Sequence, residues 1–145
     1  MPGITNPTEE YFKDGTWGWD GTAWRKLNLL WGYYDRILDS VLVADATAGS
    51  NVLTFTTVPV GQVWIYTTIS ALNSDTNPSV IDVNMYSPTL LVRLMEWVLP
   101  GANVTVQISG QFILKAGDTL KVVIGGCTLN DNLYAWAGGY KMKVL

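Results

Sequence analysis

Histidine is absent from this chain of 145 residues, and cysteine occurs once, at Cys127. Without histidine the chain cannot build a catalytic triad or a metal site that depends on an imidazole. A single cysteine cannot form an internal disulfide or a CxxC motif. We therefore expect Cys127 to be a small buried residue rather than a nucleophile, and the sequence points to no cofactor and no metal ion.

Charge is also scarce. Charged residues make up 14% of the chain, hydrophobic residues 48%, and the mean hydropathy is +0.19. A net charge of −3 and a pI near 4.7 disfavour a phosphate-gripping surface, so we expect no nucleic acid partner. The most hydrophobic stretch, 90–99, is interrupted by Arg93 and Glu96, and the N-terminus has no cationic start before an apolar run. We expect neither membrane insertion nor a signal peptide.

No stretch shows the 3.6-residue periodicity of an amphipathic helix. From about residue 37 onward, short apolar runs alternate with turn residues, which is typical of an antiparallel β-sandwich. The sequence therefore predicts an all-β domain over residues 37–145. The predicted strands are 37–44, 51–57, 62–72, 79–86, 89–99, 104–114, 119–125 and 132–145.

Alternation along the strands predicts which residues share a face. One face of each strand needs a core, and the other is poorer in charge than usual, since no Lys or Arg occurs between Ile37 and Val92. Free sandwiches usually protect their outer faces and edges with such charges, so we expect another surface to cover this one. In strand 62–72 the two expected faces are Val63, Ile65, Thr67, Ile69 and Ala71 on one side, and Trp64, Tyr66, Thr68 and Ser70 on the other.

Residues 1–36 form a region of different composition, which we call the aromatic arm. It holds eight of the 17 aromatic residues of the chain. Within it, Asp20-Gly21 favours a type I′ turn and predicts a β-hairpin with a two-residue loop, flanked by Trp19 and Thr22. An isolated hairpin is marginal in water, so these rings need a surface to pack on. The aromatic residues of the arm are Tyr11, Phe12, Trp17, Trp19, Trp24, Trp31, Tyr33 and Tyr34.

Several stretches resemble small β-sandwich proteins encoded among the structural genes of tailed phages. The stretches are Val58–Trp64, Val106–Asp118, Gly125–Tyr134 and Gly139–Met142, and Tyr11–Leu27 resembles the W-x-x-x-G-x-x-W start of such virion proteins. The resemblance implies a jelly-roll module that serves as a building block of a virion or of a virus-like extracellular fibre. It also implies that the module carries no catalytic residues.

These features predict a non-enzymatic structural protein that assembles with copies of itself, its arm packing on neighbouring subunits in a helical fibre. The arm has an alternative, which is to fold back on its own sandwich. Alternatively, the protein decorates a capsid or forms part of a tail tip, with other virion proteins as further partners. The residues expected at the subunit joint are Tyr11, Phe12, Trp17, Trp19, Trp24, Arg25, Leu29, Leu30, Trp31, Tyr33 and Tyr34.

A carbohydrate-binding or receptor-binding module is a hypothesis of a different class, with glycans as partners. In that hypothesis Trp17, Trp19, Trp24 and Trp64 stack on sugar rings. Asn103 begins an Asn-x-Thr sequence in a predicted loop and is a candidate for glycosylation.

Carboxylates in the predicted turns have two interpretations. Asp118 and Asp131 are a minimal pair for glycoside hydrolysis if they meet in space. Asp75, Asp118 and Asp131 lack the Asp-x-Asp-x-Asp spacing of a calcium loop. We expect each turn aspartate to cap its own backbone instead.

Overall fold

The computed structural model describes residues 17–19, 24–26 and 33–143, which form ten β-strands and no helix. No membrane-spanning helix is therefore present in those residues. The strands are β1 (Trp17–Trp19), β2 (Trp24–Lys26), β3 (Tyr33–Val43), β4 (Gly49–Thr54), β5 (Gln62–Asn73), β6 (Val80–Tyr86), β7 (Leu91–Val98), β8 (Val106–Lys115), β9 (Thr119–Cys127) and β10 (Leu133–Lys143).

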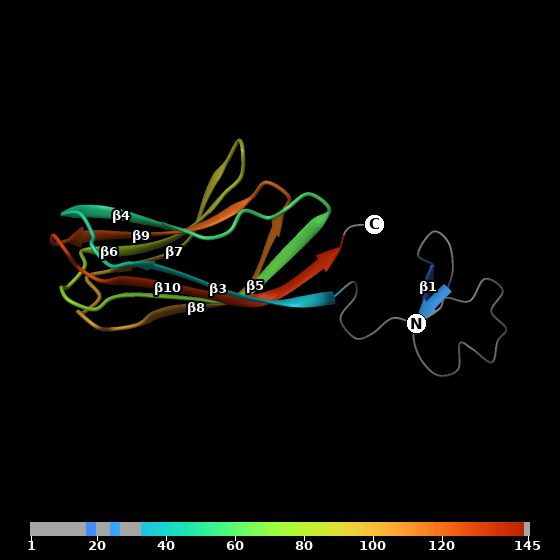
Figure 1. Cartoon of the computed structure of the whole chain (residues 1–145), viewed down its shortest axis with the longest axis horizontal. Coiled ribbons are helices and arrows are strands. Elements are labelled where there is room, and N and C mark those ends of the chain that lie inside the picture. Colours follow the sequence, from blue (N-terminus) through green and yellow to red (C-terminus); the bar gives the residue numbers. More distant parts are fainter. Residues whose placement is uncertain (1–16, 20–23, 27–32, 144–145) are drawn as a thin grey trace.

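Strands β3 to β10 form two antiparallel sheets that face each other (Figure 1). Sheet I has the order β3-β10-β5-β8, and sheet II has the order β4-β9-β6-β7. All eight predicted strands are present, and the prediction of an all-β sandwich is confirmed. Strand β3 begins at Tyr33, so the sandwich includes the last residues of the range that the sequence assigned to the arm.

The core lies between the two sheets and is built from both. Its largest fully buried side chains include Tyr66 and Ile69 of sheet I and Ile81, Leu120 and Ile124 of sheet II. Leu120, Val122 and Ile124 alternate with Lys121, as expected for a strand with one face in the core. Cys127 is also in the core, with an exposed fraction of 4%, which confirms the expectation that it is a small buried residue.

Strand β5 departs from the simple alternation that its sequence predicts. Trp64 and Tyr66 belong to the core together with Ile69 and Ala71, although the sequence placed these two pairs on opposite faces. The reason is a bulge: the pairing of β5 with both neighbours shifts around Thr67, and one extra residue reverses the alternation beyond it.

Gly139 of β10 lies beside this bulge and has no room for a side chain. A Cβ atom on Gly139 would lie 1.9 Å from the carbonyl oxygen of Ile65, which is far inside van der Waals contact. Glycine at this position therefore permits the close approach of β10 to the bulged strand.

One carboxylate ties together the loops at the end of the sandwich where β5 and β9 finish. Asp131 has an exposed fraction of 2%. Its Oδ2 accepts hydrogen bonds from Thr128 N (2.8 Å), Asn73 Nδ2 (2.7 Å) and Thr76 Oγ1 (2.5 Å), and its Oδ1 accepts one from Thr128 Oγ1 (2.6 Å). Burial opposes ionisation of Asp131, but these hydrogen bonds outweigh it and lower its pKa to about 2.

Strands β1 and β2 form the hairpin expected in the arm, with a different register. Trp19 pairs with Trp24, so residues 20–23 connect the strands, whereas a two-residue loop at Asp20-Gly21 would pair Trp19 with Thr22. Hairpin loops of four residues are also common. The observed register places two tryptophan positions opposite each other, and cross-strand aromatic pairs favour one register over another.

Candidate assembly surface

The outer face of sheet II carries charged side chains that pair with one another. Arg93 of β7 lies 3.4 Å from Asp82 of β6 (Nη2 to Oδ2) and also bonds Glu96. Lys121 of β9 lies over the ring of Tyr86, 4.3 Å from its centroid. Burial raises the pKa of Asp82, and the Arg93 guanidinium partly offsets that effect. The strands of this sheet also expose Val52, Leu91 and Val98, so the face combines charged and apolar side chains.

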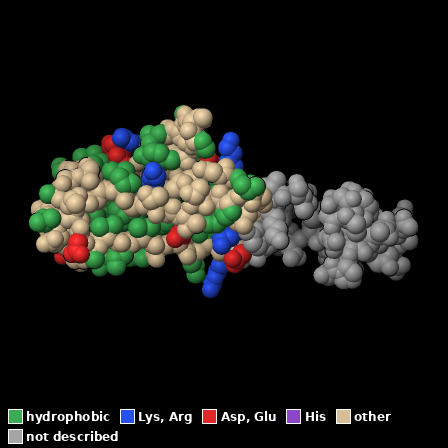
Figure 2. Space-filling model, turned by 45° about the horizontal axis from the view of Figure 1, so that its top comes forward, with side chains coloured by type: hydrophobic (Ala, Val, Ile, Leu, Met, Phe, Trp, Pro, Cys, Tyr) green, Lys and Arg blue, Asp and Glu red, His purple; other side chains and the backbone are tan. Residues whose placement is uncertain are grey.

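The outer face of sheet I is different, because three successive rows across it contain no charged residue. The pairing registers define the rows. On the side of the molecule seen in Figure 2, Lys, Arg, Asp and Glu are few among hydrophobic and other side chains. Leu38, Leu42 and Trp136 are exposed to 75%, 58% and 40%. The rows are Leu42, Tyr134 and Leu72; Ser40, Trp136, Ser70 and Gln107; and Leu38, Gly138, Thr68 and Ser109.

A hollow of about 370 Å³ lies on this face beside Trp136. The indole of Trp136 stacks on Tyr134, with 5.7 Å between ring centroids and 11° between ring planes. The next position on the same face of β10 is Gly138, which has no side chain. We call this hollow the Trp136 slot, and it is bordered by Leu38, Asp39 and Ser40 on β3, Thr68 and Ser70 on β5, and Trp136, Ala137 and Gly138 on β10.

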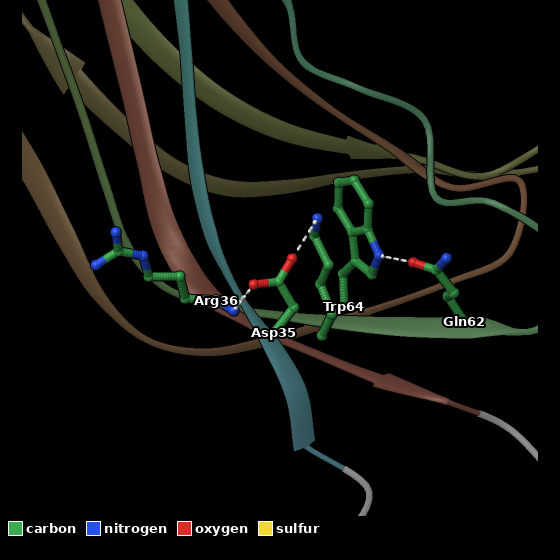
Figure 3. Close-up of polar contacts among 5 residues, drawn as sticks. Asp35, Arg36, Gln62 and Trp64 are labelled. Carbon is green, nitrogen blue, oxygen red and sulfur yellow. Dashed lines mark hydrogen bonds and ion pairs between the residues drawn. The ribbon is translucent and has the colours of Figure 1, made fainter.

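The arm leaves the sandwich at the start of β3, where side chains tie β3 to β10 and β5 (Figure 3). Asp35 Oδ2 lies 3.5 Å from Lys141 Nζ, and Asp35 Oδ1 accepts a hydrogen bond from Arg36 N (2.8 Å). Lys141 Nζ also lies 5.0 Å from the ring centroid of Trp64, whose Nε1 donates to Gln62 Oε1 (2.7 Å). These contacts hold the start of β3 against β10 and β5.

A buried hydroxyl lies near this end of the core. Tyr66 is fully buried, and no hydrogen-bond partner for its hydroxyl occurs among the described residues. Burial raises the pKa of Tyr66, and the negative charge of Asp39 raises it further. Asp39 itself accepts a hydrogen bond from Thr56 N (3.1 Å). Tyr66 is therefore a neutral core residue, with no route to act as an acid or base at the surface.

The structure separates the two carboxylates that would be needed for glycoside hydrolysis. Asp118 follows β8 and Asp131 precedes β10, so they lie beyond opposite ends of β9, about 30 Å apart for a strand of nine residues. Each caps its own turn, as expected: Asp118 Oδ2 accepts from Lys115 N (3.0 Å), and Asp131 from Thr128 N. The hypothesis that this pair forms a catalytic site is wrong.

The other sequence candidates have different outcomes. Trp64 has an exposed fraction of 5%, so it cannot be the sugar-stacking ring that the carbohydrate hypothesis required. Asn103 is exposed in the loop between β7 and β8, as expected, with a φ of 53°. Within the described residues, no group of three or more Cys, Asp and Glu side chains is placed to hold a metal ion.

The side chains of the residues predicted at the subunit joint lie outside the part of the chain that the structure describes. Trp17, Trp19, Trp24, Arg25, Tyr33 and Tyr34 lie in described strands, but their side chains fall outside the described residues. The others lie wholly outside them: Tyr11, Phe12, Leu29, Leu30 and Trp31.

Sequence reasoning missed Trp136, although the signal was present. Leu133, Ala135 and Ala137 are buried, and residues at the intervening positions must point to the other face of β10. The small alanines therefore mark the core side of the strand, and they place Tyr134 and Trp136 outside.

No protein-family model matches the chain, and no curated protein sequence matches it. Among solved structures, the chain is similar to Eiger TNF from S. frugiperda, with a TM-score of 0.32 and 11% identity, over 77% of this chain and 94% of that chain. This likeness is too low to inform function, and it does not link the chain to virion or fibre proteins.

Proposed function

We propose that this chain is a non-enzymatic structural protein that assembles with copies of itself through its aromatic arm, as a subunit of a virion-associated or extracellular helical fibre. The observation that carries the proposal is the contrast between the two outer faces. The outer face of sheet II carries Arg93, Glu96 and Lys121 together with the buried Asp82, whereas three rows of sheet I contain no charged residue. An uncharged sheet face with exposed leucine and tryptophan is typical of an interaction surface.

The strand order supports a jelly-roll for the sandwich. The chain alternates between sheets from β3 to β6, passes to β7 within sheet II, and then alternates again to β10. The first and last strands of the sandwich, β3 and β10, are neighbours in sheet I. Wrapping of this kind joins two antiparallel four-stranded sheets in a jelly-roll.

A contact in which the arm of one copy binds the sheet of another is heterologous, because the two copies contribute different surfaces. Heterologous contacts produce an open filament unless their rotation happens to close a ring. This favours a helical fibre, with capsid decoration and a tail-tip role as closed-ring alternatives.

Sedimentation velocity and negative-stain microscopy of the purified full chain test the proposal. We expect association that grows with protein concentration, and long regular threads in the images. Small closed particles of fixed size would contradict the helical fibre and would favour capsid decoration or a tail-tip role. A chain that stays monomeric at every concentration would contradict assembly itself.

A further inference from the structure

We propose that the Trp136 slot receives an aromatic ring from the arm of a second copy, and that the donor is one of the hairpin tryptophans Trp17, Trp19 and Trp24. The proposal rests on the proposed function, because it names the surface to which the arm binds. Three features of the slot carry it: the empty position at Gly138, the stacked wall formed by Trp136, and a lining in which Asp39 is the one charged residue.

Neither the backbone conformation nor the packing at position 138 requires a glycine. Its φ lies outside the left-handed region, and an added Cβ would meet only the carbonyl oxygen of Ile37, at 3.9 Å. The neighbouring Gly139 is the opposite case, since a Cβ there would collide with backbone. Glycine in the middle of a strand weakens it, and it often marks a place where another group approaches closely.

The gap left by Gly138 has the size of one aromatic ring. Residues on the same face of a strand are about 7 Å apart, and aromatic rings stack or meet edge-on with about 4.5 to 7 Å between centroids. The Trp136 indole stacks on Tyr134, and Gly138 is the next same-face position along β10. A second ring entering the gap would pack against the indole.

The lining of the slot favours an aromatic side chain over a sugar. Leu38 and Trp136 supply apolar surface, and Ser40, Thr68 and Ser70 supply small hydroxyl side chains. Asp39 also borders the hollow, but Thr56 N already engages its carboxylate. A sugar ring needs several directed polar partners around its hydroxyls, whereas an indole needs apolar walls and at most one acceptor for its N–H.

The arm contains several aromatic rings, and the length of chain between them and β3 sets how far they reach. Residues 27–32 join Lys26 to Tyr33 and span at most about 25 Å when fully extended. The slot lies beside Leu38 and Ser40, about 17 to 23 Å along β3 from Tyr33. Trp24 lies nine residues before Tyr33, a span of about 30 Å, so its ring can also reach the slot of its own copy. The choice of a second copy rests on the proposed function, and a mixing experiment tests it.

The test fills the slot in the full chain. Gly138→Leu places a side chain in the gap without a backbone clash, and Thr54→Leu adds the same side chain to an exposed position of sheet II as the matched control. By sedimentation velocity, we expect Gly138→Leu to weaken association about tenfold or more, and Thr54→Leu to match the unmodified chain. Circular dichroism and thermal melting check that both variants fold. Leu38→Lys, which puts a charge at the exposed rim, gives an independent second reading if Gly138→Leu does not fold.

A mixing experiment separates binding between copies from folding back. The Gly138→Leu chain keeps the donor but lacks the slot, and the triple variant Trp17→Ser, Trp19→Ser, Trp24→Ser keeps the slot but lacks the donor. We expect each to be monomeric alone and the mixture to form a one-to-one pair. Loss of association in both variants without recovery in the mixture would overturn binding to a second copy.

The remaining outcomes distinguish this proposal from the proposed function. If the unmodified chain associates and the slot variants associate equally well, the slot proposal is overturned and assembly stands. If the unmodified chain does not associate, both are overturned. If affinity electrophoresis shows that a neutral polysaccharide binds the unmodified chain but not Gly138→Leu, while association is unchanged, the slot is a sugar site and the arm is not its occupant.

Discussion

At the scale of the residue, Asp131 connects ionisation to folding. Its carboxylate accepts hydrogen bonds from Asn73, Thr76 and Thr128, which lie in two parts of the chain that are distant in the sequence. These bonds favour the ionised form, so the pKa in the folded chain lies near 2, below its ordinary value of 3.8. The folded state is therefore stabilised wherever Asp131 is ionised.

We predict that Asp131→Ala lowers the free energy of unfolding at neutral pH by about 3 kcal/mol, because it leaves buried donors without an acceptor. In the unmodified chain, the Asp131 contribution is complete above about pH 4 and is lost as the pH falls toward 2, since the unfolded state takes up the proton first. Urea unfolding at several pH values measures both effects. Asp45→Ala, which removes an exposed carboxylate, is the control. An equal acid dependence in Asp131→Ala and the unmodified chain would contradict this assignment.

The two adjacent glycines of β10 should respond in opposite ways to the same substitution. Gly139→Ala is expected to destabilise the sandwich by about 3 kcal/mol or more, because its Cβ would lie 1.9 Å from the Ile65 carbonyl oxygen. Gly138→Ala is expected to be neutral or slightly stabilising, because only Ile37 O is near, at 3.9 Å. Thermal melting of the two variants decides this. Similar melting temperatures would show that the backbone near the bulge yields more easily than the geometry indicates.

At the scale of the element, the strands were predictable because turn residues mark their ends and alternation marks their faces. The bulge at Thr67 could not be predicted, because a single inserted residue cannot be told from its neighbours in a run of alternating side chains. The hairpin was predicted from Asp20-Gly21, but its register was not, because several loop lengths suit the same residues. The Trp136 slot needed the fold, since its walls come from three strands far apart in the chain.

The start of β3 gives an element-scale prediction for truncation. A chain that begins at residue 33 keeps every β3–β10 pair, whereas one that begins at 37 loses the pairs of Arg36, Asp35 and Tyr33 with Tyr140, Lys141 and Met142. We expect both to remain folded β proteins and the shorter one to be less stable by about 1 to 2 kcal/mol. Urea unfolding measures the difference. Association that persists in the chain beginning at 33 would contradict a role for the arm.

At the scale of the whole molecule, the outer faces of the two sheets differ in their charged residues. Sheet II has paired charges on its outer face and sheet I has none in its three central rows. In the proposed assembly, contacts through these rows of sheet I rest on burial of apolar surface and not on charge pairs. Salt screens charge pairs but leaves apolar burial almost unchanged, and sulfate strengthens it.

We predict that association of the full chain changes less than about threefold between low and moderate sodium chloride, and that it strengthens in ammonium sulfate. Sedimentation velocity in the two salt series measures this. A steep loss of association as sodium chloride rises would show that ion pairs hold the copies together, and would assign the contact to the charged residues of the arm.

The rate at which Cys127 is labelled reports how often the sandwich opens. The thiol has an exposed fraction of 4%, burial raises its pKa, and its Sγ donates to Ile124 O at 3.3 Å, so a maleimide cannot reach a reactive thiolate in the closed sandwich. Labelling therefore counts the events in which β9 comes away from its neighbours. Because the sequence contains no other cysteine, the same count is readable inside an assembled particle without any engineered probe.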